Sequence, residues 1–401
     1  MRKSCLIILI SLFFVACSTH EKTEIVFIDN PTEVKSLAPY LFTGTDGKIY
    51  MTWIEKQADI NYLKISSYQS SAWSAPNIIA SGTDWFVNWA DYPIAAELKG
   101  QYLAAFLKKS GSGTYAYDIL LHHSNKLNEW QGPKLLHDDG KQAEHGFISI
   151  IPYGENFFTA WLDGRNTVSD DATTNHGHHN HHGEHGAMTV RAAIVDAESN
   201  KIAEWEIDER VCDCCQTTAA ITANGPVVIY RDRSEDEIRD IYISRFTENE
   251  WTSPQAVFAD NWKINACPVN GPRADAFKNS LAVAWFTAAN AMAEVKVAFS
   301  LDNGESFGLP LTLNQTAPIG RVDLAMLDEK TAMVSWMEGA EIKAAKVHHS
   351  GRIEKIYHLD ESTAKRSGGF PQMTRSNNLL MFAWTDDENE KIKTAYLQLN
   401  D

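Results

Sequence analysis

Four cysteines beyond residue 17 are the side chains of this 401-residue chain best suited to chemistry. Cys212, Cys214 and Cys215 lie in one short segment, and Cys267 follows some fifty residues later. Neighbours such as Cys214 and Cys215 rarely bond to each other, so the plausible disulfides join Cys267 to one of the three and leave an unpaired remainder. Free clustered thiols suit a metal such as Cu(I) or Zn(II). Two alternatives stay open, disulfides alone and redox chemistry.

A histidine-rich insertion at 169–186 supplies a second set of potential ligands. Six imidazoles occur within ten residues, separated by Gly and Asn: His176, His178, His179, His181, His182 and His185. Such a tract can present several neutral imidazoles to one divalent cation. The alternative is a solvated loop that binds no ligand.

An internal repeat indicates which elements position these groups. Short apolar runs end in an aromatic residue at steps of about fifty residues: Trp53, Phe106, Trp161, Tyr230, Trp285, Trp336 and Trp384. Each repeat alternates strand-like segments with turns such as Asn224-Gly225, which is typical of hairpins. A period near fifty residues that is built from strands predicts a β-propeller.

The two ends of the repeat region predict how the ring closes. Glu24 to Asp29 reads as a lone strand, and the last repeat stops after a third strand at Lys391 to Leu399. Pairing these segments would complete one blade and remove two exposed sheet edges. The sequence therefore predicts an all-β domain at 24–401, a seven-bladed β-propeller of four-stranded antiparallel blades, with the last blade closed by the N-terminal strand.

One turn carries a family resemblance. The segment Ser300-Leu301-Asp302-Asn303-Gly304-Glu305-Ser306-Phe307 resembles the Asp-box of the sialidase-like (BNR) β-propeller superfamily, Ser-x-Asp-x-Gly-x-x-Trp, with Phe in place of Trp. In this motif the Asp carboxylate accepts backbone N–H groups, the Gly permits a positive φ, and the aromatic ring packs between sheets. The resemblance implies a structural turn without chemistry of its own, and seven blades here stand against six in the sialidase enzymes.

The same resemblance suggests an enzyme. Sialidases hold a substrate carboxylate with three arginines and use an Asp as acid, which makes Arg165, Arg231, Arg273, Arg321 and Asp232 candidate catalytic residues. The family expects an Arg shortly before the first blade strand, and the matching stretch Ser36-Leu-Ala-Pro39 has none. Salt bridging between blades is the alternative role for these arginines.

Propeller topology predicts that the potential ligands converge. Connections into the innermost strand of a blade share one face with the loops between second and third strands. Cys212 to Cys215 enter blade four, Cys267 enters blade five, and His145 enters blade three, whose second-to-third-strand loop is the histidine tract. We therefore expect a transition-metal site, for Cu or Zn, made of cysteine and histidine on that face.

The N-terminus resembles a bacterial lipoprotein signal. Residues 1–16 combine a basic start with an apolar run too short to span a bilayer. Phe14-Val15-Ala16-Cys17 resembles a lipobox, which implies lipidation at Cys17 and a tether at 17–23. Ser18 favours the outer membrane, and the expected location is the cell envelope. An ordinary secretory signal is the alternative.

Charge narrows the choice of partners. The formal net charge of −16 argues against nucleic acid and against electrostatic docking to anionic lipid. The leading hypothesis is a lipid-anchored propeller that binds a transition metal. An exo-α-sialidase acting on acidic sugars and a non-catalytic module that binds a glycan or an envelope protein are the alternatives.

Overall fold

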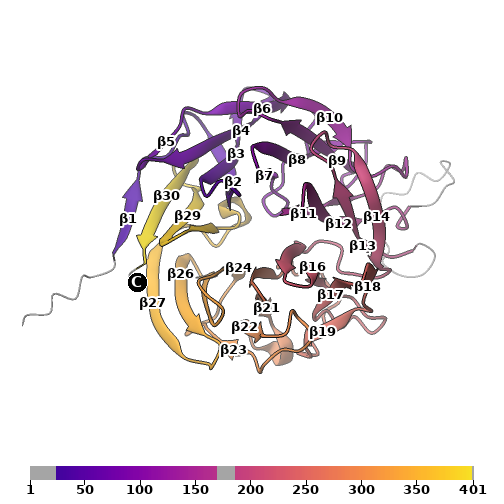
Figure 1. Ribbon diagram of the computed structural model, residues 1–401, viewed down its shortest axis with the longest axis vertical. Helices are drawn as coiled ribbons and strands as arrows, with labels where there is room; N and C mark the ends of the chain where they lie inside the picture. Colours follow the sequence, from indigo (N-terminus) through magenta and orange to yellow (C-terminus); the bar gives the residue numbers. More distant parts are fainter. Residues whose placement is uncertain (1–23, 169–185, 400–401) are drawn as a thin grey trace, which may run out of the picture.

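The computed structural model describes residues 24–168 and 186–399, which form a closed ring of seven antiparallel sheets (Figure 1). The predicted seven-bladed propeller is confirmed. Within the described ranges no helix is long and apolar enough to cross a membrane. The predicted signal peptide, Cys17, its tether and the six tract histidines lie outside these ranges.

In blades one to six the strands follow one another in the chain from the centre of the ring outward. Blade one contains β2 (Ser36–Thr43), β3 (Ile49–Gln57), β4 (Ile60–Gln69), β5 (Ala72–Trp73) and β6 (Asn77–Gly82). Blade two contains β7 (Ile94–Leu98), β8 (Gln101–Lys109), β9 (Tyr117–Ser124) and β10 (Gln131–Leu135). Blade three contains β11 (His145–Tyr153), β12 (Asn156–Asp163), β13 (Thr189–Val195) and β14 (Lys201–Asp208). Blade four contains β15 (Thr218–Thr222), β16 (Gly225–Arg231), β17 (Ile241–Thr247), β18 (Glu250–Trp251) and β19 (Gln255–Phe258).

The remaining three blades complete the ring. Blade five contains β20 (Arg273–Phe277), β21 (Ser280–Thr287), β22 (Glu294–Ser300) and β23 (Leu311–Thr312), with the short 3-10 helix η1 (Ala289–Ala291) between β21 and β22. Blade six contains β24 (Gly320–Met326), β25 (Thr331–Glu338), β26 (Glu341–His348) and β27 (Ile353–Glu361). Blade seven contains β28 (Gln372–Ser376), β29 (Leu379–Asp386), β30 (Lys391–Gln398) and β1 (Ile25–Ile28), and η2 (Arg366–Gly368) precedes it.

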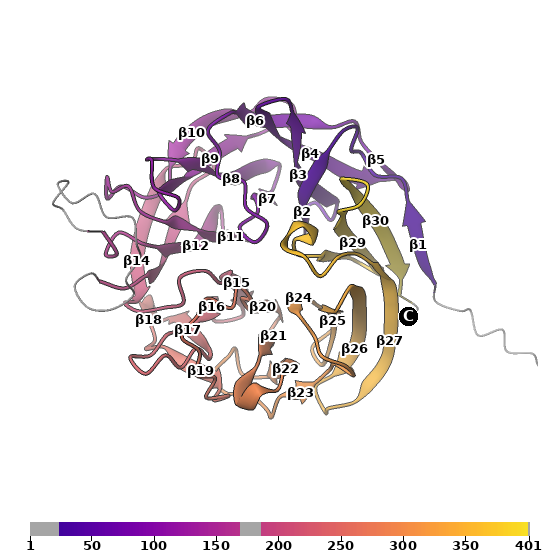
Figure 2. The same ribbon diagram turned by 180° about the vertical axis from the view of Figure 1, so that it is seen from behind.

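Blade seven joins the two ends of the described chain, as the sequence predicts. β1 pairs antiparallel with β30, in a register that places Ile25 opposite Leu397 and Ile28 opposite Thr394. Blades one and four differ from the four-strand expectation, because their outer strand is broken into two short pieces, β5 with β6 and β18 with β19. Innermost strands such as β7, β11, β15 and β20 surround the centre of the ring (Figure 2).

The seven repeating aromatic residues all lie in the second strands of the blades and are buried: Trp53, Phe106, Trp161, Tyr230, Trp285, Trp336 and Trp384. Some of these indoles also have a polar partner two residues along the same strand. Trp336 Nε1 donates to Glu338 at 2.9 Å, and Trp161 Nε1 donates to Asp163 at 2.9 Å. The repeat therefore marks the packing between neighbouring blades, where apolar burial supplies the main driving force.

The turn after β22 has the structure that the Asp-box resemblance implies. Asp302 Oδ1 accepts the Ser306 backbone N–H at 2.9 Å, and Gly304 has a φ of 83°. Phe307 packs against the core shared by blades four and five.

Replacing Asp302 by Ala is expected to destabilise the protein by about 1 kcal/mol, because this half-exposed carboxylate satisfies donors within the turn. Asp302→Asn retains one acceptor oxygen and should lose less. Equilibrium unfolding in urea measures both variants, and equal losses would contradict the assigned role of the carboxylate.

Candidate metal centre

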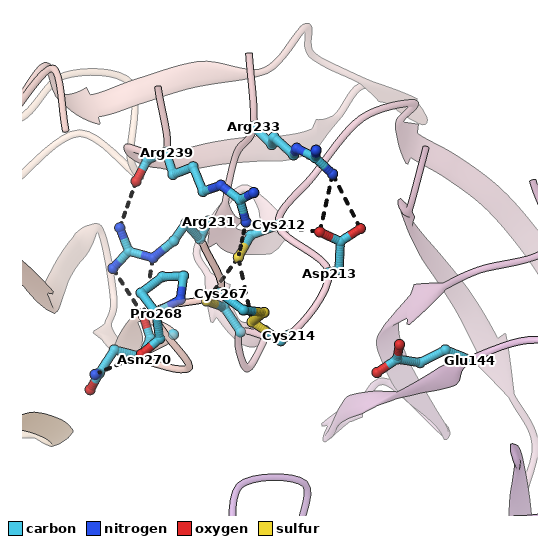
Figure 3. The surroundings of a disulfide bond; sticks show 12 residues. Glu144, Cys212, Asp213, Cys214, Arg231, Arg233, Arg239, Cys267, Pro268 and Asn270 are labelled. Atoms are coloured by element: carbon cyan, nitrogen blue, oxygen red, sulfur yellow. Dashed lines mark hydrogen bonds and ion pairs between the residues drawn. A yellow bond between two sulfur atoms is a disulfide. The ribbon is translucent and has the colours of Figure 1, made fainter. Parts of the chain in front are cut away.

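Two connections between blades bring the sulfur atoms of four cysteines together, and Figure 3 labels three of these residues, Cys212, Cys214 and Cys267. Cys212, Cys214 and Cys215 lie between β14 and β15, and Cys267 lies between β19 and β20. Cys214 is disulfide-bonded to Cys267, whereas Cys212 and Cys215 are free thiols. The Sγ of Cys212 lies 3.1 Å from that of Cys215 and 4.0 Å from that of Cys214. The structure thus joins segments from blades four and five at one point.

The backbone fixes the first cysteine beside the end of β16. The Cys212 N–H donates to the Arg231 carbonyl at 3.0 Å, and the preceding Val211 forms a bridge with Asp232. Cys212 and Cys215 are both buried. Their sulfur atoms are consequently held in the protein interior, where solvent cannot screen neighbouring charges.

The electrostatic surroundings of the sulfur atoms favour one negative charge. Burial by itself raises the pKa of Cys212, but the hydrogen bond with Cys215 and the nearby Arg239 guanidinium lower it to about 6. Arg239 Nη1 lies 3.4 Å from the Cys212 sulfur (Figure 3). Burial raises the pKa of Cys215 well above its usual value. Near neutral pH the pair therefore holds one thiolate and one thiol.

Acidic side chains orient the arginines around this thiolate. Arg239 Nη2 donates to Glu237 at 2.8 Å, and Arg233 Nη1 lies 3.2 Å from Asp213. Glu144 belongs to the neighbouring connection into β11 and lies apart from the sulfur atoms in Figure 3. Burial raises the pKa of Glu144 to about 8, so this carboxyl group adds little negative charge at neutral pH.

Two of the candidate catalytic arginines are bound to backbone carbonyls. Arg231 is buried and donates through Nε and Nη2 to the Asn270 carbonyl at 3.1 and 2.9 Å, and through Nη1 to the Arg239 carbonyl at 2.6 Å. Arg321 Nη2 donates to the Lys365 carbonyl at 2.8 Å. Donor groups of both guanidinium ions are therefore already engaged by the backbone.

The other candidate catalytic residues also contact the protein itself. Arg165 binds both carboxylate oxygens of Asp163, at 2.8 and 2.7 Å. Arg273 Nε lies 3.8 Å from Asp323 of the next blade, which agrees with the expected salt bridging. Burial raises the pKa of Asp232 to about 7. The side chains of Arg165 and Arg273 are thus engaged by carboxylates of the protein itself.

The cavity beside Arg273 near the centre of the ring is small. Tyr40, Asp91 and Gln216 are among its lining residues, and its volume of about 20 Å³ suits a single water molecule. Both oxygens of Asp91 lie 2.9 Å from the backbone nitrogen of Phe147, and burial raises the pKa of Asp91 to about 7. A sugar does not fit in this space.

His145 lies in a different cluster from the cysteines. Its Nε2 lies 3.0 Å from Asp139, and its ring stacks on that of His137 with centroids 3.6 Å apart. Burial and the neighbouring His145 lower the pKa of His137. Among the described residues, the group of closely spaced potential ligands at the sulfur atoms contains cysteines and no histidine. The structure thus separates His145 from the cysteines, whereas the six tract histidines lie outside the described residues.

Sequence reasoning did not nominate His137 or its neighbouring carboxylates. A usable signal was present, because His137 and Asp139 lie in the same connection into blade three as His145. Gly164 donates its backbone N–H to Glu144 at 2.8 Å.

No protein-family model and no curated protein matches this chain. Among solved structures, polysaccharide lyase Uly1 is similar with a TM-score of 0.54 and 8% identity, over 96% of this chain and 93% of that one. A protein of unknown function from Dyadobacter fermentans gives a TM-score of 0.51 and 11% identity, over 94% and 98% of the two chains. A neuraminidase-like protein from A/bat/Guatemala gives a TM-score of 0.50 and 11% identity, over 94% of this chain and 95% of that one. These likenesses establish a sialidase-like β-propeller fold.

Proposed function

We propose that this protein is a lipid-anchored, sialidase-like propeller of the cell envelope that binds a transition metal, copper or zinc, at its cysteine cluster. The observation that carries the proposal is the meeting of Cys212, Cys214, Cys215 and Cys267 from two separate connections. A catalytic role in sugar chemistry has less support, because Arg231 and Arg321 are bound to carbonyls.

The spacing of the sulfur atoms suits a metal–thiolate site. Metal–sulfur bonds of about 2.3 Å in a tetrahedron separate the sulfur atoms by about 3.8 Å. The Sγ of Cys212 lies 3.1 and 4.0 Å from two of the other three sulfur atoms. Binding through all four requires the two-electron reduction of the Cys214–Cys267 disulfide by a thiol reductant, which leaves two additional thiols.

Charge gives independent support. Four thiolates around one Zn²⁺ carry two excess negative charges, and around one Cu⁺ they carry three. Arg239 contacts Cys212, and the Arg231 guanidinium favours the charged forms of Cys212 and Cys215. Two buried guanidinium groups can thus offset much of the charge of the occupied site.

Protein purified without an affinity tag under reducing conditions is expected to contain one metal ion per chain tightly bound at the cysteine cluster. Cys214→Ser and Cys267→Ser should each lose this ion, because each removes one of the converging ligands. Elemental analysis by mass spectrometry measures the stoichiometry. A matched control replaces the six tract histidines by Asn, which should leave the tight site intact. Full metal content in both cysteine variants would refute the proposal.

A further inference from the structure

A second group of potential ligands lies on the blade-three side of the cysteine cluster. His137 and His145 stack with parallel rings, at an interplanar angle of 4°, and both are almost completely buried. His137 belongs to the connection between β10 and β11, and His145 is the first residue of β11. Two adjacent buried imidazoles are costly unless their nitrogen atoms find partners.

Three carboxylates approach these rings, two of them from other strands. Asp139 Oδ2 lies 3.0 Å from His145 Nε2 and 3.2 Å from His137 Nδ1. Asp163, at the end of β12, lies 3.7 Å from His145 Nε2. Asp118, in β9, faces the opposite side of the rings, at 3.5 Å from His137 Nε2.

His137 is the member of the cluster whose polar atoms are not satisfied. Only 3% of its surface is exposed, and neither ring nitrogen makes a hydrogen bond despite the nearby carboxylates. An imidazole in this condition normally has a partner. A cation on the Asp139 side of the rings would supply that partner.

The ring nitrogens that point away from Asp139, His145 Nδ1 and His137 Nε2, have neighbours typical of metal-ligating histidines. Such histidines direct the second ring N–H to a backbone carbonyl or a carboxylate. His145 Nδ1 lies 3.3 Å from the Tyr117 carbonyl, and His137 Nε2 faces Asp118. This arrangement leaves His145 Nε2 and His137 Nδ1 to face Asp139 together.

Distance and charge both favour a divalent ion. Ligands bound to a tetrahedral ion at about 2.0 Å are about 3.3 Å apart, close to the 3.0, 3.2 and 3.7 Å found here. The three carboxylates around the rings are accompanied by one guanidinium group, that of Arg165. Arg165 binds Asp163 and lies 3.5 Å from Asp139. The excess negative charge would be offset by the ion. An imidazole nitrogen binds a metal ion that lies in the plane of its ring. The two stacked rings would therefore tilt toward the ion when it binds.

We infer that His137, His145, Asp139 and Asp163 form a zinc-binding site of nitrogen and oxygen ligands, separate from the cysteine cluster. Asp118 acts from outside the ligand set, by orienting His137. The inference does not rest on the proposed function, because no sulfur ligand takes part.

The test uses untagged protein with the six tract histidines replaced by Asn, stripped of metal and titrated with Zn²⁺ alone. In a Cys267→Ser background one zinc ion per chain should still bind, and X-ray absorption should show nitrogen and oxygen ligands at about 2.0 to 2.2 Å with no sulfur. His137→Ala should abolish stoichiometric binding. Asp118→Asn, which keeps the size of the side chain, should weaken zinc binding about 10- to 100-fold.

The largely exposed group of Glu341, His358 and Glu361, in which Glu341 is half-buried, provides a control, and His358→Ala should leave the zinc affinity unchanged. Far-UV circular dichroism of the metal-free proteins checks that each variant is folded. If His137→Ala does not fold, the Asp118→Asn titration and the absorption spectrum decide the question. Unchanged affinity in Asp118→Asn, a sulfur-containing shell, or no zinc bound in the Cys267→Ser background would each overturn the inference. Absence of a sulfur-bound metal in protein that retains all four cysteines would count against the proposed function and leave this inference standing.

Discussion

Asp91→Asn is expected to stabilise the protein at pH 8 and to change its stability little at pH 4. Asp91 is 4% exposed and its carboxylate faces the Phe147 backbone N–H. Burial raises the pKa of this carboxyl group from the usual 3.8 to about 7, although the hydrogen bond from Phe147 opposes the shift. An Asn side chain has no charge to desolvate and keeps an oxygen that accepts the same bond.

The direction of the pH dependence follows from proton binding. Between about pH 4 and 7 the folded protein keeps a proton on Asp91 that the unfolded chain releases, so stability falls as the pH rises. Since a tenfold change in proton affinity is worth about 1.4 kcal/mol, this loss reaches on the order of 4 kcal/mol above pH 7. Asp91→Asn should remove it.

Urea unfolding of the wild-type protein and of Asp91→Asn between pH 4 and 8 measures this difference. Glu338→Gln is the opposite control. In the folded wild-type protein the pKa of Glu338 is lowered to about 2, because hydrogen bonds from Thr316, Lys343 and Trp336 outweigh the effect of burial. The stabilisation that Glu338 provides is therefore present above about pH 4.5 and is lost on acidification. A difference between Asp91→Asn and wild type that is independent of pH would contradict the assignment.

Trp336→Ala is expected to destabilise the protein by about 3 to 5 kcal/mol. Its indole is 1% exposed and packs in the core shared by blades five and six, so truncation leaves a large cavity. Trp336→Phe fills most of that space and removes the hydrogen bond from Nε1 to Glu338.

The next blade offers a matched comparison for that hydrogen bond. Trp384 occupies the equivalent position in β29, but its buried Nε1 makes no hydrogen bond. Trp336→Phe should therefore cost about 1 to 2 kcal/mol more than Trp384→Phe, as measured by urea unfolding. Equal losses would mean that the indole and carboxylate contact contributes nothing.

The fold could be predicted from the sequence because packing between blades requires the same kind of residue in every repeat. Buried aromatic residues recur in each second strand, and the lone strand at the N-terminus completes β28 to β30. The broken outer strands of blades one and four were not predicted, because short edge strands carry little periodic signal.

The side-chain partners within the site were harder to predict. Topology places a connection on a face, and it therefore indicates that Cys267 approaches the other three cysteines. It does not give the direction of an individual side chain, so His145 was grouped with the cysteines although its ring faces His137 and Asp139. Likewise, Arg231 reads as a charge available to a ligand, whereas three backbone carbonyls surround its guanidinium.

The pairing of β1 with β30 has a consequence for how the chain can be rearranged. Ile25 lies opposite Leu397, so the first and last strands meet at neighbouring points on one edge of blade seven. A short linker could join them, and new termini could be opened at an exposed hairpin such as Asp46-Gly47 without removing any strand. Circular permutation should therefore preserve the ring, because its architecture depends on which blades are neighbours and not on which blade the chain enters first.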